Sequence, residues 1–158
     1  MIKKTIDATL IFHVIRFSET LKKQAEKVIL QEKITTQQWF ILLLLAKDPN
    51  IFYLQEHKHE KHMMAKELAE ALNVSRANIT NLLNVLIEKK LIVQYADETD
   101  KRRKRLKLTQ EGERIIMKLE PDRSIHNAKL FAKFSLAEKN AFIHFVKTCL
   151  QIMKPVKQ

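Results

Sequence analysis

The chain has 158 residues, and 46% of them are hydrophobic, which is enough for a folded core and argues against a disordered protein. The formal net charge of +11 favours a polyanionic partner, nucleic acid before an acidic membrane surface, and the single cysteine excludes an intramolecular disulfide framework. Only one glycine and three prolines are present, so few tight turns can form, which predicts a mainly helical fold with short connections.

A long amphipathic helix is predicted over residues 5–31. Its apolar residues recur at steps of three and four, the spacing of one helix face: Ile6, Leu10, Val14, Phe17, Leu21, Ala25 and Val28. A second stripe at Ile11 and Ile15 makes this apolar surface wider than one neighbouring helix needs. We therefore expect the first helix to contact another subunit.

The capping-box pattern of Thr35 with Gln38 predicts a second, buried helix over residues 39–46. After a short added element at 51–55, three histidines and a glutamate fall within six residues: His57, His59, Glu60 and His62. Imidazole and carboxylate groups ligate zinc, but this spacing is not a recognised one and the lysines between the histidines disfavour a cation. A solvated polar connection is therefore favoured over a metal site with His57, His59 and His62 as ligands.

A helix, a tight turn and a second helix are predicted between residues 65 and 89, with Ser75 as a good N-cap of the second helix. One face of that helix is apolar: Ile79, Leu82, Leu83 and Leu86. The start of the helix and its opposite face supply the DNA-binding candidates: Ser75, Arg76, Ala77, Thr80, Asn81 and Asn84. Because short polar side chains and an arginine suit base edges and phosphates in a major groove, we interpret this as a recognition helix.

A two-stranded β-wing is predicted next, with a strand at 91–95, a polar turn at 96–100 and a returning strand that ends at Thr109. Five consecutive cations lead into the returning strand and are the DNA-binding candidates of the wing: Lys101, Arg102, Arg103, Lys104 and Arg105. Most charge runs are merely solvated faces. Beside a helix-turn-helix, contact with phosphates or a minor groove is the favoured interpretation.

Two more helices are predicted at the C-terminal end. The first runs from Thr109 through Leu119, and Pro121 is expected to break or kink it. A capping box of Ser135 with Glu138 begins the last helix. That helix carries an apolar stripe: Phe142, Phe145, Val146, Cys149, Leu150 and Met153. Such a stripe is more often packing than a cofactor site, so we assign it, with the first helix, to a dimer interface and interpret its cysteine as an inert core thiol.

From about residue 34 to 119 the sequence closely resembles the winged-helix core of MarR-family transcriptional regulators. These segments carry the resemblance: Glu67-Leu68-Ala69, Val74-Ser75-Arg76, Thr80, Leu86 to Leu91, Asp100-x-Arg102 and Leu108-Thr109-x-x-Gly112. The sequence differs from the family's pattern at four positions: Met64, Asn81, Lys90 and Lys101. The family has a capping threonine, a common arginine, a glycine and the first of two arginines there, respectively.

The resemblance implies a mainly α fold with a small two-stranded β-wing, in which residues 35–109 form the winged helix-turn-helix DNA-binding domain. Residues 1–34 and 110–158 would form a helical dimerisation region. The implied function is a homodimeric regulator of transcription that binds double-stranded DNA, a repressor modulated by a small aromatic or phenolic ligand between the two regions. No cofactor is implied.

Nothing in the sequence supports an enzyme, since it has no glycine-rich phosphate loop, no nucleophile elbow and no trio of Ser, His and Asp at suggestive positions. Two alternatives remain open. One is a metal-responsive regulator that uses the histidine cluster at 57–62. The other is a protein-interaction or membrane-surface module that keeps the winged helix as a scaffold, which would require an exposed apolar patch. With no signal peptide and no apolar run of about 20 residues, we expect a cytoplasmic protein.

Overall fold

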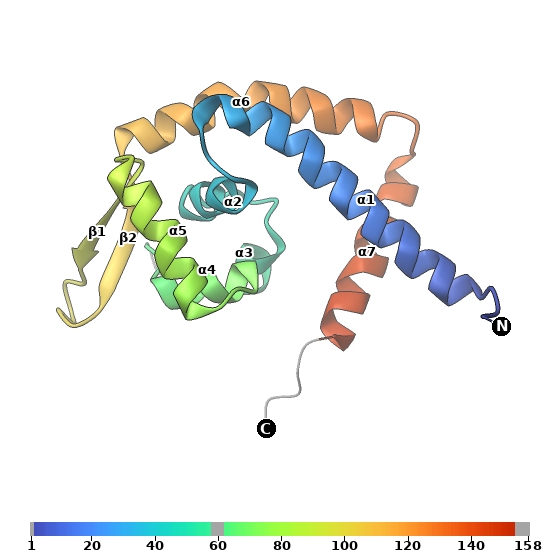
Figure 1. Cartoon of the computed structure of the whole chain (residues 1–158), viewed down its shortest axis with the longest axis horizontal. Coiled ribbons are helices and arrows are strands. Elements are labelled where there is room, and N and C mark those ends of the chain that lie inside the picture. The colour runs from blue at the N-terminus through green and yellow to red at the C-terminus, as the bar shows by residue number, and fades with distance from the viewer. Residues whose placement is uncertain (1, 58–61, 154–158) are drawn as a thin grey trace. The chain divides into compact units, whose positions relative to one another are not determined.

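The structure is a computed structural model that describes residues 2–57 and 62–153 (Figure 1). The elements in chain order are α1 (Ile6–Ile29), a 3₁₀ turn (Leu30–Glu32), α2 (Thr36–Leu45), α3 (Phe52–Glu56), α4 (Ala65–Leu72), α5 (Arg76–Glu88), β1 (Ile92–Ala96), β2 (Lys104–Leu108), α6 (Gln110–Leu130) and α7 (Leu136–Ile152). This mainly helical fold with one antiparallel strand pair confirms the predicted fold class. The chain divides into two compact units, Met1–Glu120 and Pro121–Gln158. Across the described residues, no helix combines the length and apolar character needed to cross a membrane.

Side-chain caps set where the helices begin, as predicted. The Thr35 hydroxyl accepts from the Gln38 amide at 3.2 Å, and the Gln38 side chain accepts from the Thr35 amide at 3.0 Å, which completes the capping box of α2. Ser135 and Glu138 make the same reciprocal pair at the start of α7, at 3.2 and 2.7 Å. These bonds satisfy backbone N–H groups that have no partner inside the helix.

The core of the first unit is built around α2, which contacts α4, α5 and β2. Ile41 and Leu42 are fully buried, together with Leu68 of α4 and Leu86 of α5. Burial of most of its surface explains why α2 is largely apolar rather than amphipathic, although Phe40 is 47% exposed. The helix-turn-helix and the wing are thus attached to one shared core.

Gly112 allows α6 to pass close to the chain that leaves α5. A Cβ atom at this position would lie 2.2 Å from the carbonyl oxygen of Leu91. Thr109 makes the same junction from the other side, because its amide donates to the Leu91 carbonyl at 3.1 Å and its hydroxyl donates to the Lys90 carbonyl at 2.6 Å. The Gly112 amide in turn donates to the Thr109 hydroxyl at 3.1 Å. The Leu-Thr-x-x-Gly pattern is therefore a tight joint between the wing and α6.

Of the break or kink predicted at Pro121, the break is wrong, because α6 continues through this residue to Leu130. A proline removes one backbone donor from a helix, and the turns on either side keep theirs, so the helix is carried past it. The boundary between the two compact units falls at this proline.

The apolar stripes of α1 and α7 are largely exposed in the single chain. On α1 the exposed apolar residues are Ile6, Leu10, Ile11, Phe12, Val14 and Ile15. On α7 they are Leu136, Phe142, Ile143, Phe145, Leu150 and Ile152. Cys149 is only half-buried. Neither stripe is covered within the unit to which it belongs.

Candidate nucleic-acid interface

The helix-turn-helix consists of α4 and α5 joined through Asn73, whose φ of 53° places it in the left-handed region that asparagine tolerates. The Ser75 hydroxyl accepts from the Asn78 amide at 3.2 Å, which confirms Ser75 as the N-cap of α5. At the start of α4, the Met64 amide donates to a Glu67 carboxylate oxygen at 2.7 Å. The glutamate thus caps α4 although the family's threonine is absent.

The two faces of α5 are arranged as the spacing predicted. Ile79, Leu83 and Leu86 are buried, and Leu82 is half-buried. The predicted DNA-binding residues of this segment are all exposed: Ser75, Arg76, Ala77, Thr80, Asn81 and Asn84. The Thr80 hydroxyl donates to the Arg76 carbonyl at 2.8 Å, so its remaining capacity toward a ligand is as an acceptor. These exposed residues offer both donors and acceptors and include no large apolar side chain.

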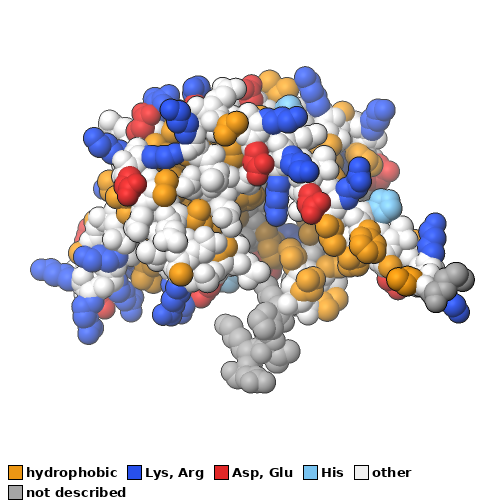
Figure 2. Space-filling model, viewed as in Figure 1, with side chains coloured by type: hydrophobic (Ala, Val, Ile, Leu, Met, Phe, Trp, Pro, Cys, Tyr) orange, Lys and Arg blue, Asp and Glu red, His pale blue; other side chains and the backbone are white. Residues whose placement is uncertain are grey.

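The wing is an antiparallel pair in which Ile92 faces Leu108 and Ala96 faces Lys104. Figure 1 shows it as a ribbon projecting beside α5, and Figure 2 shows Lys and Arg side chains gathered at the same end of the molecule. Lys101, Arg102, Arg103 and Lys104 are exposed, and the Arg102 side chain retains 93% of its accessible surface. These cations are open to a polyanion.

Arg105 was predicted among the exposed cations of the wing, and the structure corrects this. Its side chain lies under the wing, only 5% exposed, and its Nε donates to Oδ2 of Asp97 at 2.5 Å. Its Nη1 donates to the carbonyl oxygen of His62 at 2.9 Å. The run of five cations therefore presents four to solvent, because the fifth is turned into the protein by an acidic partner across the ribbon.

Sequence reasoning also missed the part that the Asp97 side chain plays in the wing. One Asp97 oxygen accepts from the Thr99 hydroxyl and amide, at 2.5 and 2.9 Å, and from the Asp100 amide at 3.0 Å. The Thr99 hydroxyl, the Asp100 amide and the Arg105 guanidinium hold the pKa of the Asp97 carboxyl well below its usual range. The only sequence signal was the presence of acidic residues in the turn, which does not say which of them pairs with which cation.

The histidine cluster does not form a metal site in the part that the structure describes. The His57 ring stacks on Tyr53 at 4.3 Å, and its Nδ1 donates to the Tyr53 carbonyl at 3.0 Å. His62 is hydrogen-bonded through Nδ1 to the Tyr95 hydroxyl. His59 and Glu60 lie outside the described residues. Within residues 2–57 and 62–153, no three His, Cys, Asp or Glu side chains are grouped to hold a metal ion.

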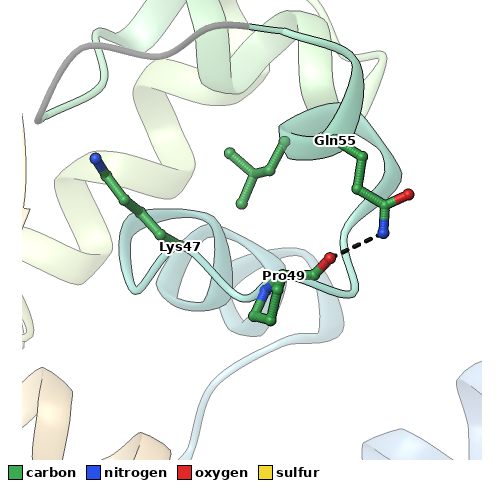
Figure 3. A pocket seen from close by; sticks show the side chains of 4 residues that line it. Lys47, Pro49 and Gln55 are labelled. Atoms are coloured by element: carbon green, nitrogen blue, oxygen red, sulfur yellow. Dashed lines mark hydrogen bonds between the residues drawn. The ribbon is translucent and has the colours of Figure 1, made fainter.

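Two shallow hollows lie on the first unit. Figure 3 shows one of about 270 Å³, lined by Lys47, Pro49, Leu54 and Gln55, in which the Gln55 side-chain amide donates to the Pro49 carbonyl at 2.8 Å. The other, of about 350 Å³, lies along the helix-turn-helix and is lined by Lys66, Ala69, Glu70, Asn73, Val74 and Arg76. Both are open to solvent, and neither has the enclosed apolar lining typical of a small-molecule site.

The sequence matches a family model described as MarR family over residues 33–103. It is 31% identical over 102 residues to the HTH-type transcriptional regulator FarR of Neisseria gonorrhoeae, an alignment that covers 65% of this chain and 62% of FarR. It is also 25% identical over 146 residues to the transcriptional activatory protein BadR of Rhodopseudomonas palustris, covering 92% of this chain and 78% of BadR. The chain thus spans somewhat less than two thirds of FarR.

Solved structures show the same fold. Staphylococcus aureus MepR in a complex with DNA superimposes with a TM-score of 0.79 at 23% identity, covering 95% of this chain and all of the MepR chain. A MarR/EmrR family transcriptional regulator from Acinetobacter sp. ADP1 superimposes with a TM-score of 0.78 at 18% identity, covering 97% of this chain and all of that one. At these identities the likeness concerns the fold.

Proposed function

We propose that the chain belongs to the MarR family and that it is a sequence-specific, DNA-binding transcriptional regulator. One observation carries the proposal: the exposed polar face of α5 and the exposed cations of the wing belong to one compact unit. The names of the relatives agree with it, since FarR and BadR are regulators of transcription and MepR has been solved with DNA.

In this proposal α5 enters a major groove and the wing contacts the flanking backbone or minor groove. Arg76, Asn81 and Asn84 would meet base edges, because an arginine fork suits guanine and an asparagine amide suits adenine. Arg102 and the neighbouring exposed cations would neutralise phosphates, which gives affinity with little sequence preference. This proposed arrangement requires no catalytic side chain.

We propose that the active form is a homodimer. The exposed apolar stripes of α1 and α7 support this, since such surfaces are costly to leave in water. Two symmetry-related recognition helices would then read half-sites about 10 base pairs apart. We further propose that the protein is a repressor, that a small aromatic or phenolic ligand controls its binding to DNA, and that it resides in the cytoplasm.

Selection of bound sequences from a pool of random DNA duplexes tests the function. We expect the wild-type protein to recover a near-palindromic motif whose half-site centres lie about one helical turn apart. Affinity for the recovered duplex should fall steeply as salt is raised, because bound phosphates release counterions. Failure to enrich any motif, with only weak binding equal for all duplexes, would contradict the proposal.

A protein-interaction module on the same scaffold would need an apolar face where α5 is exposed. The outward residues of α5 at 76, 77, 80, 81 and 84 are polar or small, which favours nucleic acid instead. A metal-responsive regulator has no support among the described residues.

A further inference from the structure

We propose that Arg105 is a positioning residue for DNA binding: it touches no DNA itself but holds the wing so that Arg102 meets the duplex. The inference rests on the proposed function, and it assigns a role to a buried cation that the DNA-contacting surface does not use. Arg105 is 4% exposed, so a phosphate could reach its guanidinium only if the wing came apart.

The first step is the attachment of the wing to the helix-turn-helix. The Arg105 Nη1 donates to the carbonyl oxygen of His62, two residues before the N-cap of α4, at 2.9 Å. The next residue along β2, Leu106, donates its amide to the Met63 carbonyl at 2.9 Å. Tyr95 of β1 is hydrogen-bonded to the His62 ring as well. The segment that leads into α4 is therefore bonded to both strands of the wing.

The second step runs from Arg105 to the tip of the wing. Its Nε donates to one carboxylate oxygen of Asp97 at 2.5 Å, and the other oxygen accepts from the amides of Thr99 and Asp100 at 2.9 and 3.0 Å. A carboxylate that accepts several bonds at once has one low-energy orientation. Arg105 thereby sets the position of the aspartate that shapes the turn.

The third step ends at the exposed arginine. Oδ1 of Asp100 accepts from the backbone amide of Arg102 at 3.1 Å and from its Nε at 3.2 Å. The Asp100 carbonyl also accepts from the Arg103 amide at 2.8 Å, and the Arg103 carbonyl accepts from the Asp97 amide at 2.9 Å. An unbroken series of hydrogen bonds thus joins the start of α4 to Arg102 through the buried guanidinium.

The chemistry of the buried pair suits positioning. A buried ion pair adds little to stability compared with an apolar pair of the same size, but its geometry is strict and removal of one partner leaves an uncompensated charge. Lysine in place of Arg105 would keep the charge but could not donate along two fixed directions to Asp97 and to the His62 carbonyl. Arg105→Lys is therefore the variant that separates geometry from charge.

A double-mutant cycle tests the inference, with the motif recovered by the wild-type protein as the probe. Arg102→Ala and Arg105→Lys should each weaken binding by about tenfold, and the double variant should also lose about tenfold rather than the roughly 100-fold expected of independent residues. Both single variants should lower the salt dependence of binding, although only Arg102 is exposed. Lys104→Ala, which removes an exposed cation of the same strand, is the control, and the loss of affinity that it causes should multiply with that of Arg102→Ala.

A measurement without DNA tests the positioning step by itself. Arg105→Lys should speed hydrogen exchange at the amides of Thr99, Asp100 and Arg102 while exchange along α5 stays at the wild-type rate. The inference would be overturned if the losses of affinity from Arg102→Ala and Arg105→Lys multiply in the double variant, or if Arg105→Lys leaves the affinity unchanged. Specific binding by the wild-type protein would still support the proposed function in either case. Unchanged hydrogen exchange at the wing amides would overturn the role of Arg105, whether or not the protein binds DNA. Failure of the wild-type protein to bind any duplex would contradict the proposed function instead.

Discussion

Single residues at the two ends of the wing show how one side chain, or its absence, sets the geometry of a DNA-binding unit. Arg105 is buried near the tip of the ribbon by Asp97, and Gly112 lets α6 approach the Leu91 carbonyl where the ribbon rejoins the helices. In both cases the residue acts on other segments and presents nothing to a ligand. The pattern alone predicted Arg105 as a surface cation, and it did not give the physical reason for Gly112.

Gly112→Ala should lower the free energy of unfolding by about 2–3 kcal/mol, because the new methyl group would meet the backbone oxygen of Leu91 rather than a flexible side chain. Glu113→Ala, at an exposed position in the same turn of α6, is the control and should change the free energy by less than about 0.5 kcal/mol. Urea denaturation measures both. Equal stability of the two variants would show that α6 does not pass so close to Leu91.

Ionisation of Tyr53 should lower the free energy of unfolding at alkaline pH. Its hydroxyl donates to Glu70 at 3.3 Å, and burial followed by the negative charge of Glu70 raises its pKa from 10.0 to about 12. A pKa raised in the folded state stabilises the fold below pH 10 and loses that contribution as the pH rises through the folded value. Wild-type stability should therefore fall between pH 10 and 12 relative to Tyr53→Phe.

The absorbance of the phenolate measures this ionisation directly. In a Tyr95→Phe variant, Tyr53 is the only remaining tyrosine, so its titration is read without interference. A midpoint near 10, the ordinary value, would contradict the contact with Glu70.

At the scale of elements, the buried face of α5 agrees with its sequence pattern, whereas the chain just after its C-terminal end has a lysine with a positive φ. Ser75 begins α5 and the apolar residues point inward, as their spacing requires. The helix ends at Glu88 with Lys89 as its C-cap, and the next residue, Lys90, has a φ of 59°, in the left-handed region where glycine is normally found. The sequence departs from the family's glycine here, but the backbone keeps the conformation that glycine would favour.

Lys90→Gly should therefore raise the free energy of unfolding by about 0.5–1 kcal/mol, since glycine adopts a positive φ without steric cost. Glu88→Gly, inside the last turn of the same helix, should lower it by a similar amount. Thermal unfolding of the two variants distinguishes them. A loss of stability at both positions would mean that the backbone at Lys90 is not left-handed.

The outward asparagines of α5 should give the operator an A·T preference. An amide can donate to and accept from adenine at the same time, and this chain has Asn81 where relatives commonly have arginine. Repeating the duplex selection with Asn81→Ala and Asn84→Ala should relax the preference at one symmetric pair of positions each, at a cost of about 1–3 kcal/mol for the favoured base.

Asn140→Ala, an exposed amide on α7, is the control and should leave the recovered motif unchanged. An asymmetric motif, rich in G·C at its outer positions and indifferent to both α5 substitutions, would reject direct reading by the asparagines. In that case the two amides would serve only local hydrogen bonds or water.

At the scale of the whole molecule, the apolar stripes of α1 and α7 are the surfaces that the single chain leaves exposed to solvent. Each belongs to a different compact unit, and each is exposed over several turns. Burying such a surface against a second copy is the usual solution in symmetric homo-oligomers. The spacing of two recognition helices would then follow from the dimer.

The protein should be a dimer at micromolar concentration by light scattering. Leu150→Glu, which places a charge in the α7 stripe where the wild-type residue is 46% exposed, should shift the equilibrium toward monomer. Gln151→Glu adds the same charge one residue along and should remain dimeric. A monodisperse wild-type monomer would remove the dimer from the proposed function.

The sequence by itself determined most of the helices, the order of the elements and the buried face of α5. These properties depend on interactions within a few residues, such as the Thr35 and Ser75 caps and the spacing of apolar residues in α5. The wing was predictable for the same reason, since strand alternation and a polar turn are local signals. The residues that contact DNA remain a prediction at both levels.

Only the tertiary structure decided which charged residues are buried and where the chain passes close to itself. Arg105 bonds to groups 8 and 43 residues away, and Gly112 is required by the carbonyl of Leu91. Burial and close approach arise when distant segments pack together, so no local pattern separates Arg105 from the exposed cations beside it. The continuation of α6 past Pro121 was also seen only in the structure, because a helix can tolerate one missing donor and the sequence does not say whether it does.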